Sequence, residues 1–144
     1  MSYLLFFTVP VSLILILLPV VVADYRSRWP TRARVRAEEK AIALLWSWLT
    51  PEQQRQWKSS GVFEVIGSDT GRRYLLTHEA VMNVHQLDPA GRSVAQWCFA
   101  PEGGLAPGDV LLAQKIALET MERDVLALAN RGPCFPQVTR RVPR

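Results

Sequence analysis

The sequence predicts an α+β protein with an N-terminal transmembrane helix, two short helices, an antiparallel meander of three or four strands and a long C-terminal helix. Three observations lead to this class: an uncharged apolar run at the start of the 144-residue chain, four short runs rich in β-forming residues, and a later apolar stripe at helical spacing. The predicted domains are a transmembrane anchor at 1–24, a basic juxtamembrane linker at 25–36, a small α+β domain at 37–130 and a basic flexible tail at 131–144.

The apolar run at 3–23 carries no charged side chain, and a helix of that length spans roughly 30 Å, the thickness of a bilayer core. Arginines follow the run and none precedes it, so the positive-inside rule predicts a single-pass signal-anchor protein with a cytoplasmic C-terminal domain. The bilayer is then a partner, and the predicted membrane-interface residues are Tyr25, Arg26, Arg28, Trp29, Arg32, Arg34 and Arg36.

The alternative to an anchor is a cleaved secretory signal, because Val21-Val22-Ala23 before Asp24 is an acceptable cleavage site. A cleaved signal would make the protein a small secreted domain in which Cys98 and Cys134 could pair, whereas a cytoplasmic domain would keep both reduced. The formal net charge of +4 comes from the arginine-rich flanks. This distribution favours a lipid surface over nucleic acid, although a nucleic-acid tethering module remains an alternative.

The first part of the predicted domain is helical. Ala41, Leu45 and Trp48 form an apolar stripe within 36–49. Thr50 and Gln53 then form a capping box with Pro51 at the first helical position, which predicts a second, short helix ending near Gly61. Three tryptophans on or near these helices are expected to pack in the core or to form a partner surface: Trp46, Trp48 and Trp57.

Four strands are predicted at 62–67, 72–78, 81–87 and 94–100, separated by turn-forming residues. The predicted inner face contains Phe63, Val65, Leu75, Met82, Val84, Trp97 and Phe99, and the other face contains Glu64, Arg72, Asn83, His85 and Gln96. Asp109 is expected to cap one long helix at 110–129, whose apolar seam consists of Leu111, Gln114, Leu118, Met121, Val125 and Leu128.

Asp69-Thr70-Gly71 is the tripeptide of aspartic proteases, in which two copies share a proton between two carboxylates. This chain contains one copy, and its neighbours Ser68 and Arg72 do not fit that pattern. An Asp-Thr-Gly segment between two strands is typical of a turn. We therefore predict a turn here.

No cofactor or metal site is predicted. His78, His85, Cys98 and Cys134 lack the close spacing that prepares zinc ligands, and two strands joined by a two-residue turn would hold the histidines about 13 Å apart. Cys98, between Trp97 and Phe99, is typical of a small buried residue. An enzyme that uses Cys98, His85 or Asp69 in a site assembled by the fold remains an alternative.

Several segments within about 40–130 resemble a small domain that recurs in bacterial and viral proteins of uncharacterised function. They are Leu49-Thr50-Pro51-Glu52-Gln53, the run from Phe63 to Tyr74, Asn83-Val84, Trp97-Cys98, Pro101, and the segments Gly108-Asp109-Val110 and Leu112-Ala113-Gln114-Lys115. The resemblance implies a self-contained α+β module and brings no established activity, cofactor or catalytic residue.

The function expected from the sequence is that of a non-catalytic, membrane-anchored accessory module. It would bind a protein of a membrane complex or a second copy of itself, since the predicted anchor would raise its local concentration near such partners.

Overall fold

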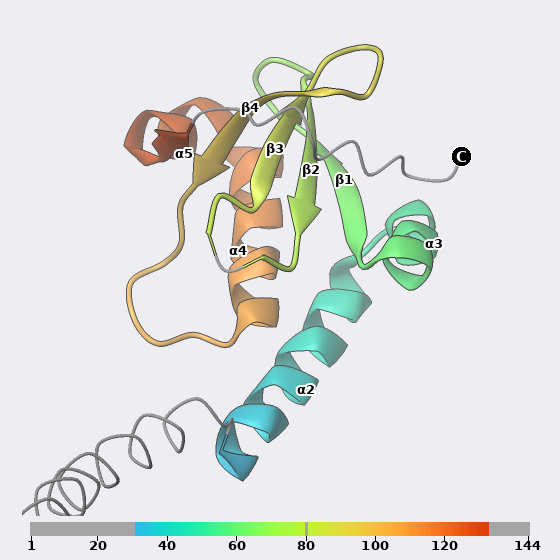
Figure 1. Ribbon diagram of the computed structural model, residues 1–144, viewed down its shortest axis with the longest axis vertical. Helices are drawn as coiled ribbons and strands as arrows, with labels where there is room; N and C mark the ends of the chain where they lie inside the picture. Colours follow the sequence, from blue (N-terminus) through green and yellow to red (C-terminus); the bar gives the residue numbers. More distant parts are fainter. Residues whose placement is uncertain (1–30, 80, 133–144) are drawn as a thin grey trace, which may run out of the picture. The chain divides into compact units, whose positions relative to one another are not determined.

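The structure, a computed structural model, describes residues 31–79 and 81–132. The chain divides into two units, Met1–Arg36 and Ala37–Arg144. The elements in chain order are α2 (Arg32–Trp48), α3 (Pro51–Ser60), β1 (Val62–Ile66), β2 (Arg73–Thr77), β3 (Val84–Leu87), β4 (Ser93–Cys98), α4 (Pro107–Thr120), α5 (Glu122–Leu128) and β5 (Asn130–Gly132), and Figure 1 labels all but the last.

Helix α3 begins and ends as its sequence predicts. The Thr50 hydroxyl accepts a hydrogen bond from the Gln53 backbone N–H (3.2 Å), and the Gln53 side chain accepts one from the Thr50 N–H (3.1 Å). Pro51 occupies the first turn, and Gly61 ends the helix in the left-handed conformation. The predicted capping box is therefore confirmed.

Two glutamines of α3 close the free edge of the sheet. Gln53 Nε2 donates to the carbonyl of Glu64 on β1 (2.8 Å), and the backbone N–H of Glu64 donates to Gln56 Oε1 (2.8 Å). Both glutamines are buried. They satisfy the same backbone groups that another strand would satisfy, and this protects β1 from pairing with a second chain.

The strands form one antiparallel sheet of order β1-β2-β3-β4-β5, and Figure 1 shows α4 lying across one face of it. The register pairs Val65 with Tyr74 and Phe63 with Leu76 and, through β3, aligns Leu76 with Val84. The main core lies between this face and the helices, and its buried residues are Leu45, Leu49, Phe63, Val65, Tyr74, Leu76, Val84, Leu111, Leu112 and Leu118. Trp97 and Phe99 pack against this core, as expected.

The inner face of β2 is not the predicted one. Tyr74 and Leu76 belong to the main core, whereas Leu75 forms a separate buried cluster with Val62 and Leu87. A one-residue shift in strand phase exchanges the two faces, and three consecutive large residues at 74–76 give no alternation from which to choose. Met82 lies before β3 with a positive φ of 55°, so it is not an inner-face strand residue as predicted.

The sheet also differs in extent from the prediction. It has five strands where three or four were expected, because residues 130–132 pair with β4. The third strand begins at Val84 and not at 81, so a six-residue connection, 78–83, replaces the expected two-residue turn. The Asn83 side chain in this connection bonds to α4 and does not lie on the predicted outer face.

The predicted single long helix is two helices, α4 and α5, which meet at Met121 (φ −149°, ψ 47°). Asp109 is not its cap: Ala106 holds that position and Asp109 lies in the first turn. The apolar seam is buried at Leu111 and Leu118, while Met121 is half-exposed and Leu128 is 88% exposed. The helix is interrupted because Glu122, the first residue of α5, forms hydrogen bonds with the turn between β1 and β2.

The membrane prediction requires a correction. Within residues 31–79 and 81–132 no helix combines the length and the apolar character needed to cross a bilayer, and this finding contradicts the predicted single-pass membrane architecture and location. The segment predicted to span, 3–23, and the predicted interface residues Tyr25, Arg26, Arg28 and Trp29 lie outside the described residues.

Candidate functional site

Glu122, the first residue of α5, is fully buried and binds the β1–β2 turn (residues 68–71). Its carboxylate accepts hydrogen bonds from the backbone N–H groups of Asp69 (2.8 Å) and Thr70 (2.7 Å). It also accepts the Thr70 hydroxyl, in a short contact, and the Tyr74 hydroxyl (2.6 Å). A Cβ added at Gly67 would lie 2.3 Å from the Glu122 Cδ, so only glycine fits beside this carboxylate.

The β1–β2 turn also caps the start of α5. The Glu122 N–H donates to Ser68 Oγ (3.3 Å), and the Arg123 N–H donates to Asp69 Oδ2 (2.9 Å). These are N–H groups of the first helical turn, which have no partner within the helix. The turn and the helix start therefore satisfy one another across about fifty residues of sequence.

Asp69-Thr70-Gly71 forms a turn between two strands, as predicted, and its contacts with Glu122 are structural. Burial raises the pKa of the Glu122 carboxyl, but hydrogen bonds from Thr70, Tyr74 and the Asp69 backbone outweigh it and hold the pKa below its usual value. Burial, the hydrogen bond to Glu122 and the adjacent carboxylate charge raise the pKa of Tyr74 far above its usual range. Both groups therefore keep one protonation state near neutral pH.

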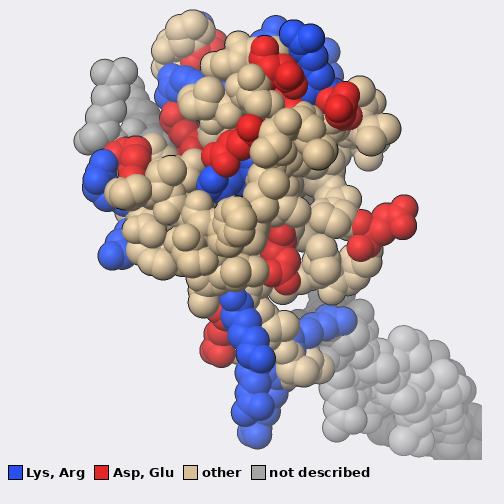
Figure 2. Space-filling view, turned by 180° about the vertical axis from the view of Figure 1, so that it is seen from behind, with Lys and Arg blue, Asp and Glu red and all other residues tan. Residues whose placement is uncertain are grey.

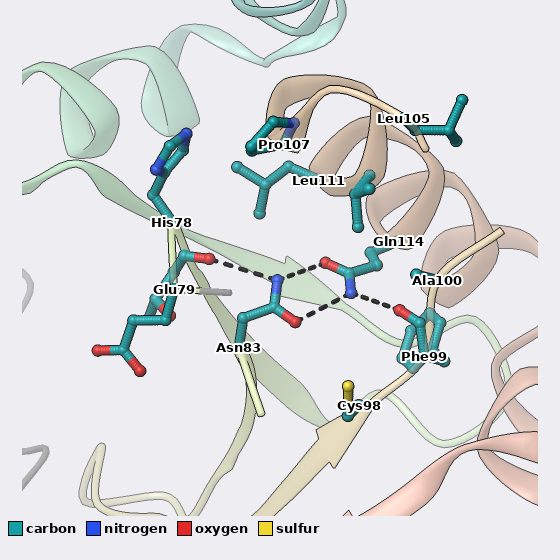
Figure 3. Close-up of a pocket in the computed structure, with 12 residues that line it drawn as sticks. His78, Glu79, Asn83, Cys98, Phe99, Ala100, Leu105, Pro107, Leu111 and Gln114 are labelled. Carbon is teal, nitrogen blue, oxygen red and sulfur yellow. Dashed lines mark hydrogen bonds between the residues drawn. The ribbon is translucent and has the colours of Figure 1, made fainter. Parts of the chain in front are cut away.

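A second buried polar contact joins the β2–β3 connection to α4. Asn83 Nδ2 donates to Gln114 Oε1 (2.7 Å), and Gln114 Nε2 donates back to Asn83 Oδ1 (3.0 Å), so we call these two side chains the amide pair. The remaining N–H groups donate to the carbonyls of Thr77 (3.3 Å) and Phe99 (2.6 Å). Figure 3 shows the two amides face to face.

The amide pair borders a cavity of about 220 Å³, which we call the amide-pair cavity. Its lining is Thr77, His78, Glu79, Asn83, Cys98, Phe99, Ala100, Leu105, Pro107, Val110, Leu111 and Gln114. Thr77 is 1% exposed, and its hydroxyl has no hydrogen-bond partner among the described residues. Thr77 pairs with Val62 in the sheet register, so its side chain lies on the face that carries Val62 and Leu75 and not on the face covered by α4.

A second cavity, of about 400 Å³, lies where α4, α5 and the end of β4 meet, and we call it the α5 cavity. Its lining is Cys98, Phe99, Ala100, Pro101, Ala113, Gln114, Ala117, Val125, Leu128 and Asn130. Leu128 projects at its rim with 88% of its surface exposed. An exposed leucine beside an apolar hollow is typical of a protein interaction site.

The polar residues considered for an enzyme lie on separate elements. Asp69 caps α5, His85 lies within β3 and Cys98 ends β4, and no hydrogen bond in the described part of the chain joins any two of them. Burial lowers the pKa of His85, which keeps its ring neutral near pH 7. Its Nδ1 lies 3.4 Å from both Ser93 Oγ and Gln96 Nε2, and its Nε2 has no partner among the described residues.

The histidines do not form a metal site with Cys98. His78 Nε2 lies 2.9 Å from Glu38 Oε1 of α2, whereas His85 is buried in the sheet. No group of three or more His, Cys, Asp or Glu side chains within 31–79 and 81–132 could hold a metal ion. Cys134 lies outside the described residues, so the structure gives no pairing for Cys98.

The three candidate tryptophans of the partner surface differ in exposure. Trp46 and Trp57 pack partly buried against the main core, and Trp57 meets Phe63 edge to face at 5.8 Å. Trp48 is 55% exposed. Of the predicted interface arginines, Arg32, Arg34 and Arg36 are described and lie exposed on α2.

Sequence reasoning did not identify Thr77 or Glu122 as site residues. The sequence places Gln114 in the apolar seam of the predicted long helix. A polar residue at such a position needs a buried hydrogen-bond partner, and this could have pointed to the contact with Asn83. Thr77 and Glu122 offered no comparable signal, because their roles depend on contacts with residues distant in sequence.

Comparison of the chain with protein-family models, curated proteins and solved structures finds no match.

Proposed function

We propose that this protein is a non-catalytic interaction module that associates with a second copy of itself through the α5 cavity and Leu128. The observation that carries the proposal is the position of an 88% exposed leucine beside an apolar cavity of about 400 Å³ on the same surface. In a two-fold dimer both copies present the same patch, so Leu128 of each copy can enter the cavity of the other.

The surroundings support an apolar contact. Ala113 and Ala117 are small residues one helical turn apart on α4, and with Val125 they line the cavity into which a leucine would pack. Figure 2 shows charged side chains of both signs most crowded at the upper end of one face, with broader areas without formal charge below them. Ile116 and Met121 add exposed apolar side chains on α4 and at the α4–α5 junction.

The proposal is tested with the full chain by sedimentation velocity over a hundredfold concentration range. The wild type should approach the mass of a dimer, and Leu128→Glu should remain a monomer because the new carboxylate would be buried without a partner. Ile66→Glu is the matched control, since Ile66 is 54% exposed on β1 at the opposite edge of the sheet. This variant should associate like the wild type.

A wild-type chain that stays monomeric throughout would overturn the proposal. Association that survives Leu128→Glu, or that Ile66→Glu weakens equally, would also overturn it, because the contact would then not depend on the α5 cavity.

A further inference from the structure

The sheet has a second face, opposite α4, which we call the far face. The strand register places Thr77 beside Val62 and His85 beside Leu75 on this face. All four side chains are buried, and Leu87 joins Val62 and Leu75 in an apolar cluster. The far face is therefore shielded from solvent, although α4 packs on the other face.

The helices of the described chain do not explain this shielding. The main core combines strand residues with residues of α2 and α4, whereas the apolar cluster contains strand residues alone. A Cβ added at Gly132 of β5 would lie 2.9 Å from Met82 Sδ, so Met82 lies at the opposite edge of the sheet from β1. The open face of an antiparallel sheet normally contacts water. Val62 and Leu75 are only 1% and 2% exposed, which indicates a cover over β1 and β2.

Two polar atoms of the far face point to the same cover. The Thr77 hydroxyl and His85 Nε2 are buried and have no hydrogen-bond partner among the described residues. On an open face, water would bond to both atoms. Burial also lowers the pKa of the His85 ring. The cover therefore extends from the apolar cluster over Thr77 and His85.

Residues 133–144 are the part of the chain best placed to supply this cover. They belong to the same compact unit as the sheet, whereas residues 1–36 form the other unit. They follow directly from β5, which pairs Gly132 with Gln96 at the edge of the sheet. Twelve extended residues span roughly 37 Å at about 3.1 Å each, and crossing from β5 to β1 requires four strand spacings of about 4.8 Å, or roughly 19 Å. The segment is therefore long enough to cross the whole far face.

The sequence of this segment favours an extended apolar strap over a further strand. Pro133, Pro136 and Pro143 lack the N–H group that a ladder needs, and proline favours the polyproline conformation. That conformation repeats every three residues, so Phe135 and Val138 would lie on the same side of the segment. Both fall within the stretch needed to cross the sheet.

We infer that residues 133–144 dock on the far face of their own chain, with Phe135 and Val138 packed against the apolar cluster. The segment that the sequence predicts to be a flexible tail thus completes the domain. This inference goes beyond the proposed self-association and does not depend on it, because no residue of the apolar cluster lines the α5 cavity.

The test uses NMR on the full chain with labelled Val and Leu methyl groups. Nuclear Overhauser effects (NOEs) should connect the methyl groups of Val62 and Leu75 with residues 133–144, foremost the Phe135 ring and the Val138 methyl groups. A mixture of labelled and unlabelled chains separates contacts within one chain from contacts between two copies. The predicted NOEs should arise within one chain.

The deciding variant is Phe135→Ser/Val138→Ser, which removes the apolar side of the segment and changes no described residue. It should lose the NOEs between the apolar cluster and residues 133–144, and the pKa of His85, measured from its ring proton shifts, should rise toward the ordinary value of about 6.5. Gln137→Ala/Thr139→Ala is the matched control, because these polar residues flank Val138 on the other sides of the segment. This control should keep the wild-type NOEs and the wild-type pKa of His85.

Absence of NOEs between the apolar cluster and residues 133–144 in the wild type would overturn the inference. NOEs from the cluster to residues 1–30 or to a second copy in their place, or an unchanged pKa of His85 in the deciding variant, would also overturn it. Leu128→Glu should keep the NOEs within one chain, so a failure of the dimer proposal and a failure of this one are distinguishable.

Discussion

The β1–β2 turn and the β2–β3 connection are each joined to the C-terminal helices by buried polar side chains, and they differ in whether any buried group is left without a partner. At the turn, four donors converge on the Glu122 carboxylate and the turn in return accepts two N–H groups of α5. At the connection, the amide pair is complete but the neighbouring Thr77 hydroxyl is not bonded within the described residues. The first contact is complete, whereas the second lies beside a buried hydroxyl without a partner in the described part of the chain.

This difference shows that burial of polar groups does not by itself mark a functional site. Glu122 is the most deeply buried acid of the described chain, and its pKa is lowered. Its hydrogen bonds nevertheless join α5 to the β1–β2 turn and to Tyr74, so they are structural. A buried acid whose hydrogen bonds are complete is evidence of a structural contact.

The largest effect is expected from Glu122→Ala. Removal of the carboxylate leaves two backbone N–H groups and the hydroxyls of Thr70 and Tyr74 without their acceptor, so the free energy of unfolding should fall by about 3–5 kcal/mol. Urea denaturation followed by tryptophan fluorescence measures the loss. Asp124→Ala is the control, because Asp124 is an exposed acid in the first turn of the same helix; this variant should lose less than about 1 kcal/mol.

The same carboxylate should make the fold sensitive to acid. Because the folded pKa of Glu122 lies below its unfolded value, its contribution is present above the ordinary glutamate pKa and declines as the pH falls through the folded pKa. The free energy of unfolding of Glu122→Gln should therefore decline less steeply below about pH 4.5 than that of the wild type, as urea denaturation at several pH values would show. Identical pH profiles would contradict it.

How far the sequence predicts these two regions depends on how local each interaction is. The capping box of α3 and the turn at 68–71 were predictable, because both depend on residues close together in the chain. The break at Met121 was not, since its cause is a set of contacts between Glu122 and a turn about fifty residues earlier. The face of β2 was also ambiguous, because Tyr74, Leu75 and Leu76 are all large and two of them pack in the main core.

An intermediate effect is expected at the amide pair. Asn83→Ala and Gln114→Ala should each lower the free energy of unfolding by about 1–3 kcal/mol, because each leaves the partner amide buried without its hydrogen bonds. The double variant should lose less than the sum of the two, and a double-mutant cycle from urea denaturation measures the difference. Strictly additive losses would show that the two amides do not stabilise one another.

The sharpest measurement is a comparison of one substitution in the two regions, Thr70→Val and Thr77→Val, by urea denaturation at pH 7. Thr70→Val removes a hydroxyl that donates to the Glu122 carboxylate and should lower the free energy of unfolding by about 1–2 kcal/mol. Thr77→Val removes a buried hydroxyl that has no partner among the described residues, so stability should stay unchanged or rise by up to about 1 kcal/mol. A loss at Thr77 equal to or larger than the loss at Thr70 would contradict the distinction between a hydroxyl that completes a structural contact and a buried hydroxyl without a partner among the described residues.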